Sequence, residues 1–408
     1  MDHNLCTRCK GRNLCREPFC RIVSKVKQFS EVIEKTDTNF MGTSPPSCFV
    51  GRAGYPKINI NVLTPSSEDK YSWTRDSPGF WYKSGFKIPE ILSRRSGMVA
   101  VRAEVSVKSE GNKFLEIARE IGQSKDQVDA EYWLERKPMY SMSFDTRMAP
   151  IGSPAKVKKA KITGNPVIAR PVEKAVGDTD LKATGAIDYL YRKKIDESTI
   201  TKIMSLGLLG IERSRKLVPT RWTITAVDDT ISKNQVRKIK DHKLLSNYLV
   251  FQNTYLGNHF EILVIPNEWQ FEVIETKFPK SVWNPGGDAP IMFSDYENYY
   301  GRKTYASNVT GAYYSARLAV AEYLSGIKRQ AAVIILREVY PEYDTPLGVW
   351  VIRETLRGAF QNKPHKFDTL GGALAHMKSK LKLPFERYKK ESRLLSNIRH
   401  QRTLAQFA

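Results

Sequence analysis

Residues Ala331–Val339 read AAVIILREV, and this stretch gives the first indication of the fold class. Its continuous apolar run predicts a strand buried in a core. The segment before it has the spacing of a helix, with apolar residues at Tyr314, Leu318, Ala321 and Leu324. A helix that leads into a buried strand predicts a mixed core, α+β or α/β.

The neighbouring segments extend this pattern. After the strand, Thr345 and Pro346 predict the start of a helix that continues through Val349, Ile352 and Leu356. Before the first helix, NHFEILVIP (258–266) and WQFEVIETKF (269–278) have the period of strands. The short polar connection between these two segments predicts a hairpin.

The earlier part of the chain is expected to be more varied. Residues 111–135 have a helical pattern. Residues 148–171 are rich in Gly, Pro and Lys and predict a solvated loop, with a linker or a basic strap across a polyanion as the alternatives. Residues 178–240 form a basic segment that is expected to be helical, although RWTITA (221–226) also alternates like a strand. Two short helices, a turn at Gly207 and the basic stretch that follows fit either a helix-turn-helix or an ordinary helical hairpin.

Composition narrows the class of partner. The chain has 408 residues, of which 41% are hydrophobic and 11% aromatic, enough for a large core. Lys and Arg number 65 against 43 Asp and Glu, a formal net charge of +22. This excess favours a polyanion such as nucleic acid, and the alternative is a solvated basic surface. The chain lacks both an 18-residue apolar run and the apolar stretch of a signal peptide, so a cytoplasmic protein is expected.

Four cysteines lie close together at the N-terminus, at Cys6, Cys9, Cys15 and Cys20. Four thiolates in residues 1–25 predict a small module that folds around a structural Zn²⁺ ion. An iron–sulfur cluster and unligated cysteines are the alternatives. Cys48 stands apart and is expected to be a buried small hydrophobic residue.

Basic residues at two places suggest phosphate contacts. Arg52 and Lys57 flank the glycines of GRAGYPK (51–57), where a tight backbone excursion could approach an anion. A plain turn explains the glycines equally well. In the basic segment, Arg215, Lys216 and Arg221 are the further candidates for binding DNA or phosphate.

Catalytic candidates are few. Asp228 and Asp229 are adjacent, and Glu275 with Lys277 has the Glu-x-Lys spacing of many metal-dependent nucleases. In such a nuclease the carboxylates would hold Mg²⁺ and the lysine would position water. Ordinary surface ion pairs are the alternative interpretation. A P-loop, a GxSxG motif and the deaminase signature are missing from the sequence, so the chain is not assigned to an enzyme class.

Several segments spread along the chain resemble one family. They are GRAGYPKINI, DTDLKATGAIDYLYRKK, MSLGLLGIERSRKLVPTRWTITAVDDTI, DYENYYGRKTYA, YYSARLAVAEYL and RQAAVIILREVYPEYDTPLGVWVIRE, together with the N-terminal cysteines. With these the chain resembles the archaeal Nre DNA-repair proteins, in particular the NreA branch. The resemblance implies a role in the response to DNA damage together with the sliding clamp PCNA. It implies no particular reaction.

The clamp-binding motif of that family can be placed at the end of the chain, on Gln401, Leu404, Phe407 and Ala408. One helical turn puts the fourth and seventh positions of the motif, Leu404 and Phe407, on one face, and this face can fill an apolar groove. Ala408 stands where a second aromatic residue is usual, which could weaken binding by roughly 1–3 kcal/mol. Alternatively, the apolar residues of 381–408 could simply continue a helical tail packed on the body.

These observations predict three parts: a zinc module at 1–25, a main body at 26–380 and a helical tail at 381–408 that ends in a PCNA-interacting peptide. The function we expect is that of a DNA-repair factor that PCNA recruits and whose basic body binds DNA. A metal-dependent nuclease and a protein that binds a small phosphorylated ligand through Arg52, Lys57 and Arg221 are the alternatives.

Overall fold

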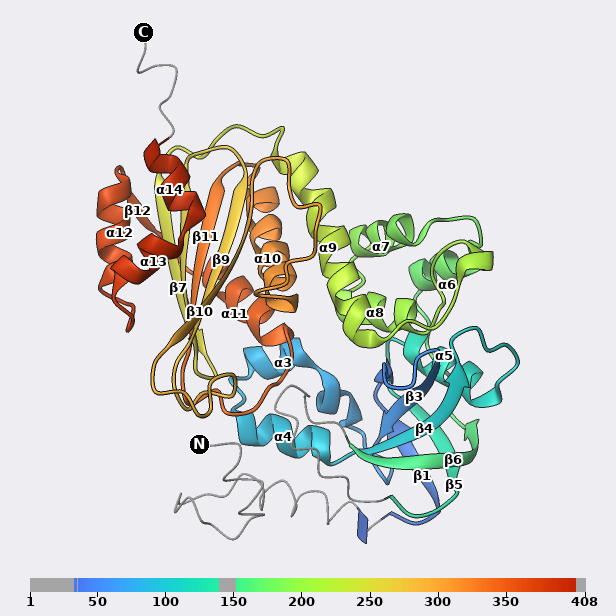
Figure 1. Cartoon of the computed structure of the whole chain (residues 1–408). Helices are drawn as coiled ribbons and strands as arrows, with labels where there is room; N and C mark the ends of the chain where they lie inside the picture. The colour runs from blue at the N-terminus through green and yellow to red at the C-terminus, as the bar shows by residue number, and fades with distance from the viewer. Residues whose placement is uncertain (1–32, 35, 139–151, 401–408) are drawn as a thin grey trace. The chain divides into compact units, whose positions relative to one another are not determined.

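The structure, a computed structural model, describes residues 33, 34, 36–138 and 152–400 (Figure 1). It divides the chain into two compact units, one that ends at Ile231 and one that begins at Ser232. The division falls inside a single long helix, α9 (Thr220–Ile239), within the main body predicted at 26–380. A boundary within a continuous helix leaves no change of composition that would reveal it. The four cysteines and the clamp peptide lie outside the described residues.

The N-terminal unit contains a six-stranded sheet in the order β1-β5-β6-β4-β3-β2. Neighbouring strands are antiparallel except for β4 and β6, which are parallel. The strands are β1 (Asn39–Ser44), β2 (Cys48–Val50), β3 (Lys57–Thr64), β4 (Val99–Ser106), β5 (Val128–Leu134) and β6 (Ser153–Ile162).

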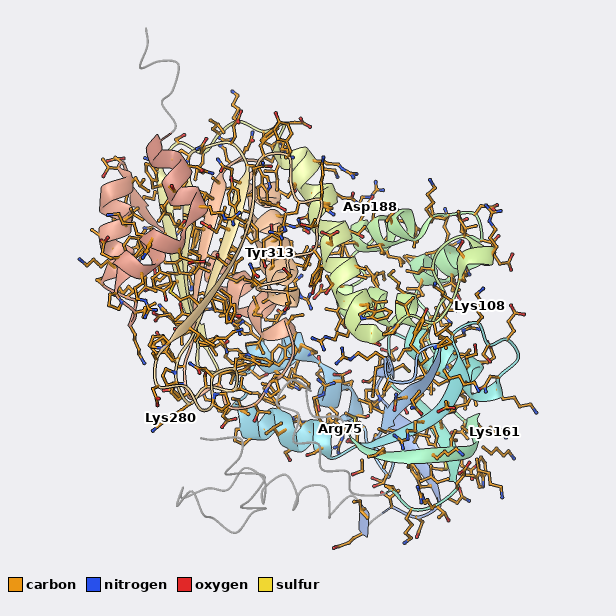
Figure 2. The ribbon with its side chains drawn as sticks, viewed as in Figure 1. Arg75, Lys108, Lys161, Asp188, Lys280 and Tyr313 are labelled. Carbon is orange, nitrogen blue, oxygen red and sulfur yellow. The ribbon has the colours of Figure 1, made fainter. Side chains whose placement is uncertain are left out.

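Strand β6 corrects the prediction of a loop at 148–171. The first part of this strand pairs with β4 and the remainder pairs with β5, so β6 connects the two halves of the sheet. Its lysines made the segment look like a solvated loop. They are tolerated because only the start of the strand lies in the core: Ser153 and Ala155 are buried, whereas Lys158 and Lys161, farther along, are exposed. Figure 2 labels Lys161.

A second correction concerns residues 111–135, which were expected to be one helix. Helix α5 ends at Gln123, and the chain then forms β5, in which buried and partly exposed residues alternate. The two periods follow each other without a glycine or proline between them, which conceals the boundary. The other helical elements of this unit are η1 (Ser72–Asp76), α3 (Pro78–Lys83), α4 (Ile88–Ser96), α5 (Lys113–Gln123), α6 (Arg170–Gly177), α7 (Ala183–Arg192), α8 (Glu197–Ser205) and η2 (Glu212–Ser214).

The two short helices predicted before Gly207 are confirmed as α7 and α8, and RWTITA belongs to the helix α9. Gly207 ends α8 with a φ of 72°. The connection from α8 to α9 contains η2 and is much longer than the turn of about 3–4 residues in a helix-turn-helix. Most of α8 is buried, including Ile200 and Ile203, so this helix is not available to enter a DNA groove.

The C-terminal unit contains a second six-stranded sheet in the order β10-β9-β11-β8-β7-β12. The predicted hairpin at 258–278 is wrong, because β11 lies between β8 and β9, antiparallel to the first and parallel to the second. All residues of β11 are buried, as its apolar run predicts. The strands are β7 (Tyr248–Tyr255), β8 (Asn258–Ile265), β9 (Gln270–Lys277), β10 (Ile291–Glu297), β11 (Ala332–Val339) and β12 (His365–Phe367).

Helices cover both faces of this second sheet. Figure 1 shows α10 (Gly311–Ile327) and α11 (Trp350–Gln361) on one face, and α12 (Leu370–Lys378), α13 (Phe385–Glu391) and α14 (Arg393–His400) on the other. The predicted helix before β11 is confirmed as α10. The helix after β11 begins at Trp350 and not at Thr345, whose hydroxyl donates to Asp344 Oδ1 at 2.7 Å. Among the described helices, none is both long and apolar enough to cross a membrane.

Two buried glutamates fasten the helical tail to this sheet. Glu338 of β11 accepts hydrogen bonds from the amides of Lys382 (3.0 Å) and Leu383 (2.8 Å). Glu272 of β9 accepts from the amide of Arg393 (2.8 Å) at the start of α14, and burial raises the pKa of its carboxyl group. The described part of the tail therefore packs on the body, and the clamp motif begins one residue after α14 ends.

Candidate nucleic-acid interface

The turn between β2 and β3 carries two of the predicted phosphate contacts, Arg52 and Lys57. Its backbone closes through a hydrogen bond from the Lys57 amide to the carbonyl of Gly54 at 2.9 Å. Gly54 has a φ of 79°, and a Cβ atom at this position would lie 2.6 Å from the carbonyl oxygen of Lys57. Only glycine fits here without strain, so the turn has a defined shape.

Hydrogen bonds join this turn to the start of α9. The amide of Val50, the last residue of β2, donates to Thr220 Oγ1 at 2.8 Å across 170 positions of sequence. Thr220 Oγ1 also lies 2.7 Å from Ser205 Oγ, and that hydroxyl donates to the carbonyl of Val218 at 2.8 Å. These bonds fix the first turn of α9 against the sheet.

Two aromatic rings meet where the turn and the helix come together. The rings of Tyr55 and Trp222 are 5.8 Å apart between centroids and inclined by 48°. Both are unusually open for large aromatic residues, with 45% of Tyr55 and 49% of Trp222 exposed. Sequence reasoning selected the basic residues of this site but missed the rings, although GRAGYPK and PTRW put an aromatic residue in the same short segment as each cation.

Three cations lie in the same two segments as the ring pair. Arg52 and Lys57 are exposed in the same turn as Tyr55, and Arg221 is exposed beside Trp222. Within the described part of the chain, neither an ion pair nor a hydrogen bond engages these three side chains. Their charges are therefore available to an anionic ligand. We call this site the Trp222 surface, and its residues are Arg52, Tyr55, Lys57, Arg221 and Trp222.

The two other basic candidates have different environments. Arg215 donates to the carbonyls of Gly210 (2.8 Å), Val176 (2.9 Å) and Asp178 (2.8 Å), which ties the end of α6 to the segment before α9. A guanidinium engaged in this way has a structural role. Lys216 is exposed, and its backbone packs closely against Gly207.

The surroundings of the carboxylates proposed for catalysis do not favour a metal site. Asp228 and Asp229 lie on α9, with Asp228 buried. Adjacent helical positions point about 100° apart, so the two carboxylates do not share a face. Among the residues that the structure describes, His, Cys, Asp and Glu side chains do not gather in a group of three that could hold a metal ion.

Glu275 is a buried ion-pair residue. Its carboxylate binds the Arg337 guanidinium, and Lys277 Nζ lies 3.1 Å from Oε2. Burial acts to raise the pKa of Glu275, but the charges of Arg337 and Lys277 outweigh it and the pKa is lowered. A carboxylate neutralised by two cations is a poor ligand for Mg²⁺. The ion-pair interpretation of Glu-x-Lys therefore fits the geometry, although the pair is buried rather than at the surface.

Cys48 has the environment that the sequence predicts. It is buried, its thiol lies 3.4 Å from the carbonyl oxygen of Ala118, and burial raises its pKa to about 12. A thiol of such high pKa is not a nucleophile near neutral pH. The predicted zinc ligands Cys6, Cys9, Cys15 and Cys20 lie outside the described residues, as do Gln401, Leu404, Phe407 and Ala408.

Comparison with known proteins covers nearly the whole chain. The family model described as Archaeal Nre, N-terminal, matches residues 14–284, and Archaeal Nre, C-terminal, matches residues 297–407. The DNA repair protein NreB of Archaeoglobus fulgidus is 36% identical over 98% of this chain and 99% of its own length. The DNA repair protein NreA of Haloferax volcanii is 33% identical over 98% of this chain and 97% of its own length. The NreA of A. fulgidus is 38% identical over 90% of this chain and 92% of its own length. No solved structure matches. The chain belongs to the archaeal Nre family.

Proposed function

We propose that this protein is a cytoplasmic DNA-repair factor that contacts DNA through the Trp222 surface. Relatives that bear the name DNA repair protein match it over almost their full length, which supports the repair context. The observation that carries the DNA contact is the meeting of two exposed rings with three unpaired cations. This site brings together segments that are far apart in sequence.

The chemistry of the Trp222 surface suits a phosphate backbone with accessible bases. Cations bind phosphates and release counterions, which gives an affinity that falls steeply with salt. An exposed ring can stack on a base, and such a contact contributes roughly 1–3 kcal/mol. The formal net charge of +22 favours the approach of any nucleic acid.

Binding to labelled DNA as a function of salt tests this proposal. Arg221→Ala should weaken binding and reduce the slope of log K against log salt by about 1, since one phosphate contact is lost. Trp222→Ala should weaken binding by about tenfold without changing that slope. Trp73→Ala is the matched control, because Trp73 is also exposed but packs on Phe80 in another part of the unit.

A competition experiment distinguishes DNA binding from the alternative, the binding of a small phosphorylated ligand. A nucleotide that displaces DNA at micromolar concentration, and whose own binding needs Arg52, Lys57 and Arg221, would favour that alternative. Unchanged DNA binding in both Arg221→Ala and Trp222→Ala would refute the DNA-contact proposal.

Recruitment by PCNA is the second part of the proposal, with Gln401, Leu404 and Phe407 as the groove-binding residues. The fastening of residues 382–394 to the sheet supports it, because the motif then follows a segment of fixed position. Leu404→Ala with Phe407→Ala should abolish co-elution with PCNA. Ala408→Tyr should strengthen it, since it restores the second aromatic residue. Co-elution that persists in the double variant would contradict this part.

We also propose that Cys6, Cys9, Cys15 and Cys20 hold one structural zinc ion. A closed set of four thiolates suits zinc, which would supply the folding energy of a segment with little apolar content. Elemental analysis should give one zinc per chain, and Cys9→Ser should lower that content. Iron and sulfide at cluster stoichiometry would establish the alternative.

The nuclease alternative finds no support in the carboxylates that suggested it. Glu275 is committed to Arg337 and Lys277, and the two aspartates on α9 do not face one ion. For this reason we assign no reaction to Asp228, Asp229, Glu275 or Lys277. A Mg²⁺-dependent cleavage of DNA that Glu275→Gln abolishes would reverse this assignment.

A further inference from the structure

A loop in the C-terminal unit, between β10 and α10, presents tyrosines to solvent. The sequence NYYGRKTYASN (298–308) forms it. Asn298 shapes its first turn, accepting from the Tyr300 amide on its side chain (3.0 Å) and from the Gly301 amide on its carbonyl (2.9 Å). Gly301 has a φ of 81°, which completes a tight turn with Tyr300 at its tip.

Arg302 holds the two sides of this loop together. Its guanidinium donates to the carbonyls of Tyr296 (2.9 Å) and Tyr305 (3.1 Å) and pairs with Asp295 at 3.1 Å. The other carboxylate oxygen of Asp295 accepts from the amides of Asn308 (3.0 Å) and Val309 (2.7 Å). Since Asp295 is buried and neutralised, the loop has a fixed conformation without an exposed acidic charge at its base.

The tyrosines are exposed because this fixed backbone places them outside the core. Tyr300 is 89% exposed and Tyr305 is 53% exposed. The ring of Tyr305 stacks on Tyr314 at 5.4 Å between centroids, and Tyr314 in turn contacts the buried Tyr313, which Figure 2 labels on α10. Tyr305 is therefore supported from the core side, and its remaining surface faces solvent.

Cations lie next to these rings. Lys240, the residue after α9, places Nζ 4.6 Å from the centroid of Tyr299, and the centroids of the Tyr299 and Tyr300 rings are 5.6 Å apart. Arg237 precedes Lys240 by about one helical turn and is exposed, and Lys303 is exposed in the loop itself. Positive charges and aromatic rings therefore occur together in this loop and at Lys240, which contacts it.

We propose that this loop binds single-stranded nucleic acid, with bases stacked on Tyr300 and Tyr305 and phosphates bound by Arg237, Lys240 and Lys303. Fixed, exposed rings can stack only on bases whose faces are open, which excludes an intact duplex. The surrounding cations favour a polyanion over an apolar protein surface. This site goes beyond the proposed function, because it lies in the other unit and shares no residue with the Trp222 surface.

The test is fluorescence anisotropy on the full chain with a labelled thymidine 20-mer, its ribose counterpart and a duplex of the same length. Tyr300→Ala should weaken binding of the single strand about tenfold and leave duplex binding unchanged. Tyr300→Phe should retain the affinity, since it keeps the ring. Tyr71→Ala is the matched control, because Tyr71 is an exposed tyrosine of the N-terminal unit.

Photocrosslinking gives a second readout. A 5-iododeoxyuridine oligonucleotide should form an adduct that mass spectrometry places on Tyr300 or Tyr305 in the unmodified protein. The adduct should persist in Trp222→Ala, which separates this site from the Trp222 surface. Equal affinity of Tyr300→Ala and the unmodified protein for the single strand would overturn the proposal, as would an equal loss of duplex binding. The ribose and deoxyribose arms decide whether RNA or DNA is preferred.

Discussion

The Trp222 surface and the Tyr300 loop have similar side chains but are built differently. The first joins segments 170 positions apart through neutral hydrogen bonds, such as that from Val50 to Thr220. The second is a single short loop held by the ion pair of Arg302 with Asp295. One therefore depends on distant packing, and the other depends on a local charge. The same contrast extends to the units: the C-terminal unit buries whole ion pairs, whereas in the N-terminal unit the Arg75–Asp69 pair remains partly exposed (26% and 22%).

Glu275→Gln should destabilise the protein more than any other variant considered, because it removes the negative charge that pairs with buried Arg337. We expect a loss of about 3–5 kcal/mol in the free energy of unfolding at pH 7, measured by urea denaturation. The pKa of Glu275 is lowered in the folded protein, so its contribution is complete above its unfolded pKa of about 4.3 and declines as the pH falls through the folded value. The difference between the two proteins should therefore shrink in acid. A difference that stays constant from pH 7 to acid would contradict this assignment.

Arg302→Ala should come next, with a loss of about 3 kcal/mol, since it leaves the buried Asp295 without its cation. Hydrogen exchange followed by mass spectrometry should show faster exchange in peptides that cover 298–310. Binding of single strands should fall while the Trp222 surface keeps its affinity. Lys303→Ala is the control for the exchange measurement, because it removes a cation from the same loop without removing a buried partner. Slow exchange of the loop in Arg302→Ala would show that the ion pair does not hold it.

Gly54→Ala tests the other surface. The positive φ and the approach of the new Cβ to Lys57 O should cost about 1–3 kcal/mol and displace Arg52, Tyr55 and Lys57. DNA binding at the Trp222 surface should weaken, and crosslinking to Tyr300 should persist. Gly79→Ala is matched to it, because a Cβ there meets open space. If the two glycine variants behave alike, the turn does not position the site.

Thr220→Val should have the smallest effect, about 1 kcal/mol, because the amide of Val50 loses its acceptor. The valine keeps the shape of the side chain, so the loss reports on hydrogen bonding. The turn should be held less firmly against α9, so DNA binding should weaken modestly. The dependence of binding on salt should stay the same. Ser198→Ala, a hydroxyl that bonds only within its own helix start, provides the comparison.

Secondary structure could be predicted where a single period extends over a long segment. The apolar run of β11, the helix α10 before it and the helices α7 and α8 all follow this rule. The errors occur where the local pattern of residues does not indicate which strand a segment pairs with. The strands β8 and β9 look like a hairpin, but β11 enters between them from 55 or more residues away, and β6 pairs through a backbone that its lysines conceal.

The residues of the candidate site were likewise predicted only in part. Residue type alone selected Arg52, Lys57 and Arg221, which are exposed in the structure, and it selected Arg215 equally strongly. Arg215 instead binds three carbonyls, and Glu275 lies between two cations, because each meets partners from other elements. The numbers of charged and aromatic residues can be counted in the sequence. Whether a given side chain is available to a ligand depends on the residues that pack around it in the fold.

The sequence alone determined the properties that depend on composition or on short spacings between residues. These are the family membership, the basic character, the cluster of four N-terminal cysteines and the motif at the C-terminus. The meeting of Tyr55 with Trp222 and the division of the chain inside α9 came from the folded structure alone. The reason is physical: contacts between segments far apart in sequence are selected by the packing of the whole core, and a local pattern contains no record of its distant partner.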